Sequence, residues 1–226
     1  MSDPLFLGIE TSLAQGSVAL FQGNKPLFGA NFTTNSRASN ALWPPLKEAI
    51  NFYLTLETPL SAVIVGLGPA SYNGTRVGIA AAQGIALQAG CPTIGLSSYE
   101  GIEDSNEPYL AIGDARRGQY SVFAGPGPVS AEEHRFVSAS ELTTLIEEAF
   151  AAGKRVVTFE ETSRFPLPEH LINSLQSVSS QADQLIRSFA KKPLEQQITC
   201  QAQPPQPLYL RPPHITASKK PSPLSR

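Results

Sequence analysis

The sequence predicts an α/β fold of two lobes, in which mixed sheets are flanked by helices and the second lobe is reduced. Two observations lead to this prediction. Short β-branched runs such as residues 62–65 alternate with longer helical patterns in both halves of the chain. The alanine-rich stretch 77–89 is apolar on every side at helical spacing, and no charged residue occurs between Arg76 and Glu100. Such a helix needs a sheet on one face and a further packing partner on another.

The first lobe is expected to span residues 1–103. Its β-branched and apolar runs predict strands at 5–9, 17–21, 26–33, 62–65 and 93–96. A helix is predicted over 35–56, where Pro44 and Pro45 force a start or a kink. Trp43, the only tryptophan, lies beside them. It is either a core residue or an anchor on a partner surface, where tryptophan is enriched.

A smaller second lobe is expected over residues 104–192, after a polar linker. It opens with a predicted hairpin of strands at 109–114 and 119–124. Arg116 and Arg117 lie in the turn of this hairpin, where they either grip an anionic group or form a solvated turn.

The rest of the second lobe continues the same alternation. Ser138 and Glu141 form a capping box that opens an amphipathic helix, and Gly153 ends this helix. A strand at 155–159 and helices at 169–175 and 181–190 are predicted next. Residues 193–226 are rich in Pro, Gln and Ser, so we expect a C-terminal tail in which only residues 208–210 pack.

Composition and charge narrow the function classes. Hydrophobic residues make up 41% of the 226-residue chain, enough for a core, whereas a net charge of −2 gives no overall attraction to nucleic acid. Cys91 and Cys200 lie far apart without metal-ligand spacing, so two reduced thiols are expected. The N-terminus lacks a signal-peptide pattern, and no apolar run reaches the ~18 residues of a membrane helix. We therefore expect a soluble, cytoplasmic protein.

The turn after the first strand carries Glu10, Thr11 and Ser12. A strand, a hydroxyl-rich turn and a second strand open the actin-like and sugar-kinase-like ATPases, where hydroxyls and turn amides donate to phosphate. An ordinary hairpin loop capped by Thr and Ser explains the same residues equally well. Because Glu10 stands where those ATPases usually have Asp, we expect a vestigial phosphate loop on the surface. Replacing Glu10 or Ser12 by Ala is then expected to leave the fold intact.

Residues 68–78 read G-P-A-S-Y-N-G-T-R-V-G and resemble the G-P-G-S-F-T-G-x-R-[IV]-G signature of the TsaB family. The shared positions include Gly68, Ser71, Gly74 and Arg76, and the departures are Ala70, Tyr72 and Asn73. Three further segments agree in order with the family: residues 7–12, 112–118 and 209–211. The resemblance therefore extends over most of the chain.

The resemblance implies an actin-like (ASKHA) fold without chemistry of its own. It implies a non-catalytic subunit that pairs with TsaD, is joined by the ATPase TsaE, and supports threonylcarbamoyl transfer to the adenosine beside the anticodon of tRNA. The tRNA would be reached through the complex, and the isolated chain has a homodimer as an alternative. No cofactor of its own is implied, because ATP, metal and threonylcarbamoyl-adenylate belong to the partner complex.

A metal centre of the TsaD type is not expected in this chain. The resemblance aligns two metal-binding histidines of TsaD with Ser98 and Ile102, and isoleucine cannot ligate a metal. The three histidines, His134, His170 and His214, offer no pair at helical spacing.

A partner-binding surface is expected on the helix over 77–89. Gly78, Ala82, Ile85 and Ala89 lie on one side of it, and a stripe of mostly small residues lets another helix approach closely. These residues and Trp43 form the predicted interface, so Ala82→Glu should abolish pairing and leave the chain folded. The alternative is that another part of the same chain covers the stripe.

Other function classes fit the sequence less well. A kinase or ATPase acting alone is the alternative, with nucleotide in a cleft between the lobes, and ATP turnover by the pure chain would favour it. However, the sequence has no Gly-Lys-Ser/Thr phosphate loop and no Gly-x-Ser-x-Gly elbow, and Ser71 replaces the third glycine of a dinucleotide fingerprint. Ser98 and Ile102 argue against a metalloprotease-like enzyme.

Overall fold

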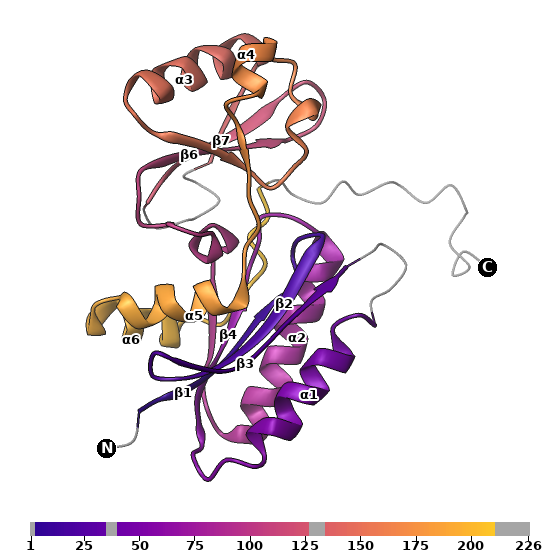
Figure 1. Cartoon of the computed structure of the whole chain (residues 1–226), viewed down its shortest axis with the longest axis vertical. Coiled ribbons are helices and arrows are strands. Elements are labelled where there is room, and N and C mark those ends of the chain that lie inside the picture. The colour runs from indigo at the N-terminus through magenta and orange to yellow at the C-terminus, as the bar shows by residue number, and fades with distance from the viewer. Residues whose placement is uncertain (1–2, 35–39, 127–133, 211–226) are drawn as a thin grey trace, which may run out of the picture.

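A computed structural model describes residues 3–34, 40–126 and 134–210 of the chain. Two lobes lie one above the other, and each is built around a five-stranded mixed sheet (Figure 1). The first sheet comes from the N-terminal part of the chain and the second from residues beyond 108. The predicted helix start over residues 35–39 and the tail beyond residue 210 lie outside the described residues.

The first sheet has the strand order β3-β2-β1-β4-β5. Its strands are β1 (Leu5–Glu10), β2 (Gln15–Gln22), β3 (Lys25–Thr33), β4 (Leu60–Gly66) and β5 (Thr93–Leu96). The first three pair antiparallel, whereas β4 and β5 run parallel to β1. The predicted strands are confirmed, with ends that differ by up to two residues. Because β1, β4 and β5 are parallel, their carboxyl ends meet at one edge of the sheet.

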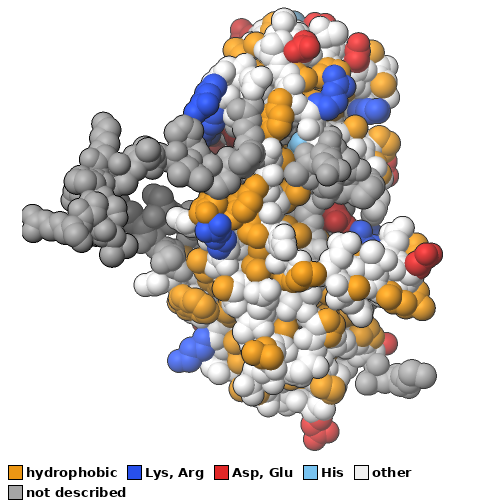
Figure 2. Space-filling model, turned by 180° about the vertical axis from the view of Figure 1, so that it is seen from behind, with side chains coloured by type: hydrophobic (Ala, Val, Ile, Leu, Met, Phe, Trp, Pro, Cys, Tyr) orange, Lys and Arg blue, Asp and Glu red, His pale blue; other side chains and the backbone are white. Residues whose placement is uncertain are grey.

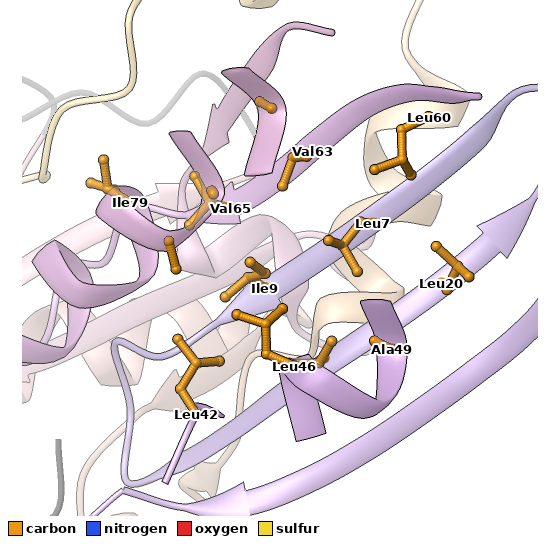
Figure 3. Close-up of a cluster of buried hydrophobic side chains, with 14 of the residues drawn as sticks. Leu7, Ile9, Leu20, Leu42, Leu46, Ala49, Leu60, Val63, Val65 and Ile79 are labelled. Carbon is orange, nitrogen blue, oxygen red and sulfur yellow. The ribbon is translucent and has the colours of Figure 1, made fainter. Parts of the chain in front are cut away.

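Helices α1 (Trp43–Tyr53) and α2 (Tyr72–Ala89) cover one face of this sheet (Figure 1). The two prolines start α1 rather than kink it, since they occupy its first positions. Ser71 caps the start of α2, and Gly90 ends it in the left-handed conformation. Figure 3 shows the core between these helices and the sheet, which includes Leu7, Ile9, Leu46, Val63, Val65 and Ile79.

Helix α5 (Ala182–Lys191) covers the opposite face of the first sheet, although the sequence predicted it as part of the second lobe. It lies so close to β1 that a side chain at Gly8 would meet the carbonyl of Ala182 at 2.7 Å. The hydroxyl of Ser17 accepts a hydrogen bond from the amide of Ala182 at 2.8 Å, which fixes the helix start on β2. The chain therefore returns to the first lobe after completing the second. Helix α6 (Leu194–Ala202) follows, where only a Pro-rich tail was expected.

The second sheet repeats the topology of the first, with the order β10-β9-β6-β7-β8. Its strands are β6 (Tyr109–Asp114), β7 (Tyr120–Gly125), β8 (Arg135–Val137), β9 (Arg155–Thr158) and β10 (Gln176–Ser177). As in the first sheet, three strands pair antiparallel (β6, β7 and β8), whereas β9 and β10 run parallel to β6. Helix α3 (Ala139–Ala151) starts at the predicted capping box, and α4 (Glu169–Ile172) is one turn long. The second lobe is thus a reduced copy of the first.

Two short 3-10 helices complete the described structure. One, η1 (Ser98–Gly101), follows β5 and leads into the second lobe, and the other, η3 (Thr162–Arg164), follows β9. The buried ring of Tyr99 in η1 stacks on Phe159 of the second lobe at 4.6 Å between ring centres. The junction between the lobes is therefore packed with aromatic side chains.

Candidate functional site

The two lobes enclose a cleft of about 610 Å³ at the carboxyl ends of the parallel strands. The first lobe contributes Ser12 and the start of the family motif at Pro69 to Tyr72. The second lobe contributes Asp114, Arg116 and Glu160. The expected cleft between the halves therefore exists, and its lining includes Ser12, Ser71 and Arg116 of the polar residues singled out in the sequence.

The carboxylate of Glu10 lies fully buried behind this cleft. One oxygen accepts a hydrogen bond from the amide of Ser12 at 2.7 Å, and the other accepts one from the hydroxyl of Ser98 at 2.7 Å. The hydroxyls of Ser12 and Ser98 lie 2.9 Å apart, and the amide of Gly68 donates to Ser98 at 3.1 Å. A side chain at Gly66 would overlap the Glu10 carboxylate. Glu10 thus joins the ends of β1, β4 and β5.

Thr11 is held just as firmly by the first turns of α2. Its hydroxyl donates to the carbonyl of Gly74 at 2.8 Å. A side chain at Gly74 would overlap the carbonyl oxygen of Thr11, and one at Gly78 would overlap its hydroxyl. Two glycines of the motif are therefore required by the close approach of this loop.

The expectation of a surface loop at Glu10, Thr11 and Ser12 is wrong. All three residues are buried, and their polar side-chain groups bond to Ser98, to Gly74 and to the loop itself. The groups that a phosphate would need as donors are therefore used within the protein. For the same reason, alanine at Glu10 or Ser12 should not be silent, because it would leave buried groups without partners.

Ser98 and Ile102, which the resemblance placed at the positions of metal-binding histidines, both have roles in the packing of the protein. Ser98 belongs to the Glu10 network, and Ile102 is buried in the aromatic junction between the lobes. Among the described residues, no group of three or more His, Cys, Asp or Glu side chains is arranged to hold a metal ion.

The motif arginine, Arg76, contacts the C-terminal segment. Its Nε donates to the hydroxyl of Tyr209 at 2.7 Å, and its guanidinium lies 3.8 Å above the ring of Tyr72. The rings of Tyr72 and Tyr209 stack with centres 5.2 Å apart. Two segments that carry the family resemblance, 133 residues apart at this contact, therefore meet. Sequence reasoning missed this contact, although both segments had been singled out.

Gly78 and Ala82 of the predicted partner stripe on α2 face the core of the first lobe. Ala82 is completely buried in the core of the first lobe, and Gly78 is buried against Thr11. Ile85 and Ala89 are half-buried and pack against the same core. The sheet lies on this side of α2 because small residues let the helix approach it closely.

The exposed side of α2 forms an apolar groove with α1. This groove has a volume of about 540 Å³ and is lined by Trp43, Leu46, Lys47 and Ile50 of α1 and by Ala80, Ala81, Gly84 and Ile85 of α2. Trp43 is 50% exposed, so the core interpretation of this residue is wrong. On the face in Figure 2, charged side chains gather on the upper, second lobe, while the first lobe shows mainly apolar and uncharged polar groups.

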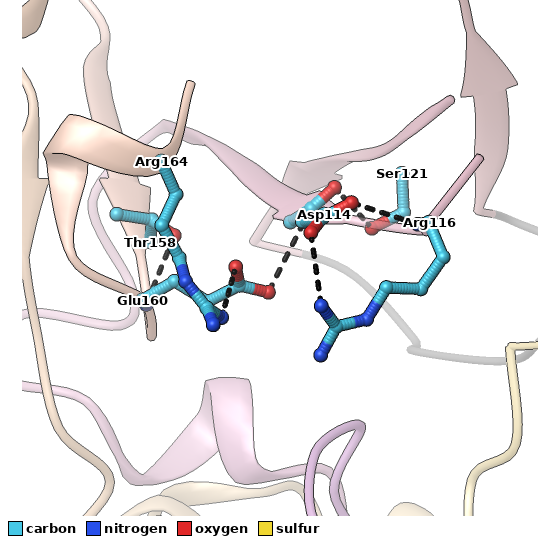
Figure 4. Close-up of polar contacts among 7 residues, drawn as sticks. Asp114, Arg116, Ser121, Thr158, Glu160 and Arg164 are labelled. Atoms are coloured by element: carbon cyan, nitrogen blue, oxygen red, sulfur yellow. Dashed lines mark hydrogen bonds and ion pairs between the residues drawn. The ribbon is translucent and has the colours of Figure 1, made fainter. Parts of the chain in front are cut away.

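Two ion pairs lie on the second-lobe side of the cleft (Figure 4). Arg116 contacts the carboxylate of Asp114 at 3.5 Å, and Arg164 contacts that of Glu160 at 3.4 Å. Glu160 also accepts a hydrogen bond from the amide of Asp114, which links the two pairs. Arg116 and Arg117 adopt the left-handed conformation in an exposed hairpin turn. The charge of Arg116 is balanced by Asp114, which fits a solvated turn better than an anion grip for this residue.

The two thiols are poor candidates for nucleophiles. Cys91 and Cys200 are free and half-buried, and burial raises the pKa of each thiol. The reactive thiolate is therefore disfavoured at neutral pH. Among the helices in the described ranges, none is long and apolar enough to cross a membrane.

Comparisons with known proteins agree on a family. The family model described as "TsaD: tRNA N6-adenosine threonylcarbamoyltransferase" matches residues 34–203. The tRNA threonylcarbamoyladenosine biosynthesis protein TsaB of Escherichia coli (strain K12) is 36% identical over 93 residues. That match covers 41% of this chain and 39% of the relative, so it spans about two-fifths of the relative's length.

Two solved structures from Pseudomonas aeruginosa are similar over nearly the whole chain. YeaZ has a TM-score of 0.65 at 19% identity, covering 91% of this chain and 100% of that one. An uncharacterized protein with similarity to peptidase YeaZ has a TM-score of 0.62 at 19% identity, covering 92% and 100%. At 19% sequence identity, this structural similarity supports a conclusion about the fold alone. With the repeated sheets, it confirms the predicted two-lobed actin-like α/β fold.

Proposed function

Since this chain belongs to the TsaB family, within the wider family described as TsaD, we propose that it is an accessory subunit for threonylcarbamoyladenosine modification of tRNA. In this role it binds TsaD, with TsaE joining the pair, and has no catalytic step of its own. ATP, metal and threonylcarbamoyl-adenylate belong to the partner proteins, and tRNA is reached through the complex. The assembly works in the cytoplasm, where its tRNA substrate is found.

The buried state of Glu10, Thr11 and Ser12 is the observation that carries the non-catalytic role. An ASKHA-type ATPase needs free hydroxyl and amide donors in this turn to hold phosphate. Here the amide of Ser12 donates to Glu10 and the hydroxyl of Thr11 donates to Gly74.

The groove between α1 and α2 is the surface that we propose for TsaD. It offers an exposed tryptophan and a nearly uncharged lining, in which Lys47 is the one charged side chain among the described residues. Leu87, 86% exposed, extends the apolar surface along α2. Aromatic anchors with few charges at the centre are typical of protein interfaces. This surface keeps Trp43 and Ile85 of the interface that the sequence suggested, and it leaves out the buried Gly78 and Ala82.

A charge placed in the groove tests this proposal. Ala80 is exposed and lines the groove, so Ala80→Glu should leave the isolated chain folded. At the centre of an interface, an unpaired carboxylate costs several kcal/mol, and binding to TsaD should fall by more than about 100-fold. Affinity by titration calorimetry and tRNA modification in a reconstituted assay would measure the loss.

Thr144→Glu is the matched control, because Thr144 is an exposed helix residue of the second lobe. This variant should bind TsaD as the unchanged chain does. Normal binding by Ala80→Glu would remove the groove from the interface. Sizing chromatography of the chain alone would show whether the same groove also forms a homodimer, which Ala80→Glu should then dissociate.

The cleft of about 610 Å³ favours one alternative, an ASKHA-type kinase or ATPase that acts alone. Turnover of ATP by the pure chain would support that function. Modification activity that appears only when TsaD is added would support the accessory role instead.

A further inference from the structure

The C-terminal segment 203–210 passes between the two lobes (Figure 1). It starts where α6 ends, and Gln203 lines a cavity of about 670 Å³ between the lobes, near the Lys192–Glu100 ion pair. At its other end, Leu208, Tyr209 and Leu210 line the cleft of about 610 Å³. The segment therefore runs from one cavity at the junction between the lobes to the other.

The segment is bound by both its backbone and a side chain. The amide of Leu208 donates to the carbonyl of Leu67 at 2.8 Å, just beyond the end of β4. The ring of Tyr209 stacks on Tyr72, and its hydroxyl accepts from Arg76 at 2.7 Å. Arg76 itself lies 3.8 Å above the Tyr72 ring, so one guanidinium orders both tyrosines.

Three prolines, Pro204, Pro205 and Pro207, lie in the same short segment. Proline fixes its own φ and disfavours helical backbone in the preceding residue, so the free segment is already extended. Little conformational freedom is then lost when it binds. A short connection to α6 also keeps its local concentration near the site high.

We propose that Leu67, Tyr72 and Arg76 form a binding site for an extended, proline-rich peptide with a tyrosine after the prolines, and that the chain's own segment 203–210 is its resident ligand. The site lies at the mouth of the cleft, so the bound segment closes the junction between the lobes. This inference is independent of the proposed function, because it rests on contacts within the chain.

Hydrogen exchange of the full-length protein tests the site. The three prolines have no backbone N–H, so few positions in 203–210 can exchange. Exchange at the backbone N–H of Leu208 reports on its hydrogen bond to Leu67. It should be protected in the unchanged protein. Tyr209→Ala removes the stacked ring and the hydroxyl acceptor, so exchange at Leu208 should accelerate by about tenfold or more.

Three further variants make the outcome decisive. Tyr209→Phe keeps the ring and loses only the acceptor, so its effect should be intermediate. Arg76→Ala should resemble Tyr209→Ala, while exposed Gln206→Ala should leave exchange unchanged. Circular dichroism would verify that each variant is folded. If Arg76→Ala is unfolded, the test rests on Tyr209→Ala, whose substitution lies outside the helices and strands of both lobes. Exchange at Leu208 at the rate of an unstructured peptide, or the same rate in Tyr209→Ala as in the unchanged protein, would overturn the proposal.

Discussion

The carboxylate of Glu10 holds three strand ends together from a position without access to water. Its two oxygens accept bonds from Ser12 and Ser98, and the absence of a side chain at Gly66 makes room for it. A buried carboxylate is stable only while such donors surround it, and the donors in turn depend on it.

We therefore expect Glu10→Ala to lower the free energy of unfolding by about 1–3 kcal/mol, because the Ser12 amide and Ser98 hydroxyl lose their acceptor. Urea denaturation followed by the fluorescence of Trp43, which lies in the same lobe, would measure this. The control is Glu57→Ala at an exposed loop position, which should change stability by no more than about 0.5 kcal/mol. Equal effects of the two substitutions would mean that the Glu10 network contributes nothing.

The sequence predicted which residues form this loop but not that they are buried. Glu, Thr and Ser are usually exposed, and burial becomes stable only when each polar group has a partner. The partners here, Gly74 and Ser98, lie more than 60 residues away along the chain. Local patterns carry no information about such pairings.

Helix α2 contains one glycine where packing leaves no room for a side chain and another where a side chain would fit. Gly78 faces the sheet, where a side chain would overlap the Thr11 hydroxyl, whereas Gly84 faces the groove with nothing within 4 Å. Both lie inside the same helix, so their backbone preferences are alike. Substituting alanine at Gly78 and at Gly84 therefore distinguishes the effect of helix propensity on stability from the effect of packing.

Gly84→Ala should stabilise the isolated chain by about 0.5–1 kcal/mol, because alanine has the higher helix propensity. Gly78→Ala should destabilise it by about 1–3 kcal/mol, because the loop must move to admit a methyl group. The midpoints of urea unfolding would therefore shift in opposite directions. Shifts in the same direction would show that Thr11 and α2 do not pack as described.

The end of α2 at Ala89 was predicted, but its start at Tyr72, its cap at Ser71 and its buried face were not. A helix that is apolar on every side gives no amphipathic direction, so the choice of Gly78 and Ala82 as the exposed stripe had no local support. Which face of α2 is buried is determined by its contact with the first sheet. Helix α5 shows the same limit, because its apolar stripe was recognised but could not reveal which sheet it covers.

Across the whole molecule, the first lobe is completed by residues from near the end of the chain. Phe189 of α5 is buried and meets Phe6 of β1 edge-on, with ring centres 5.8 Å apart. The same cluster joins Ile64 and Leu96 to α5. The second lobe is thus an insertion within the first.

Phe189→Ala should accordingly destabilise the first lobe by about 3–5 kcal/mol, as a large cavity would open beneath the sheet. Trp43 fluorescence follows this lobe during urea unfolding, because it is the only tryptophan. The control is Leu194→Ala in α6, since Leu194 is 72% exposed and should tolerate the change. An unchanged Trp43 transition in Phe189→Ala would show that α5 does not support the first lobe.

The return of α5 to the first sheet also sets the order of events during synthesis. Residues 5–96 leave the ribosome first, yet one face of their sheet stays uncovered until α5 has emerged. Until then Phe6, Ile64 and Ile94 are exposed to water and to other nascent chains. The second lobe can fold while the first lobe still lacks α5. This face of the first sheet can therefore be covered only after α5, which follows the whole second lobe in the sequence, has been translated.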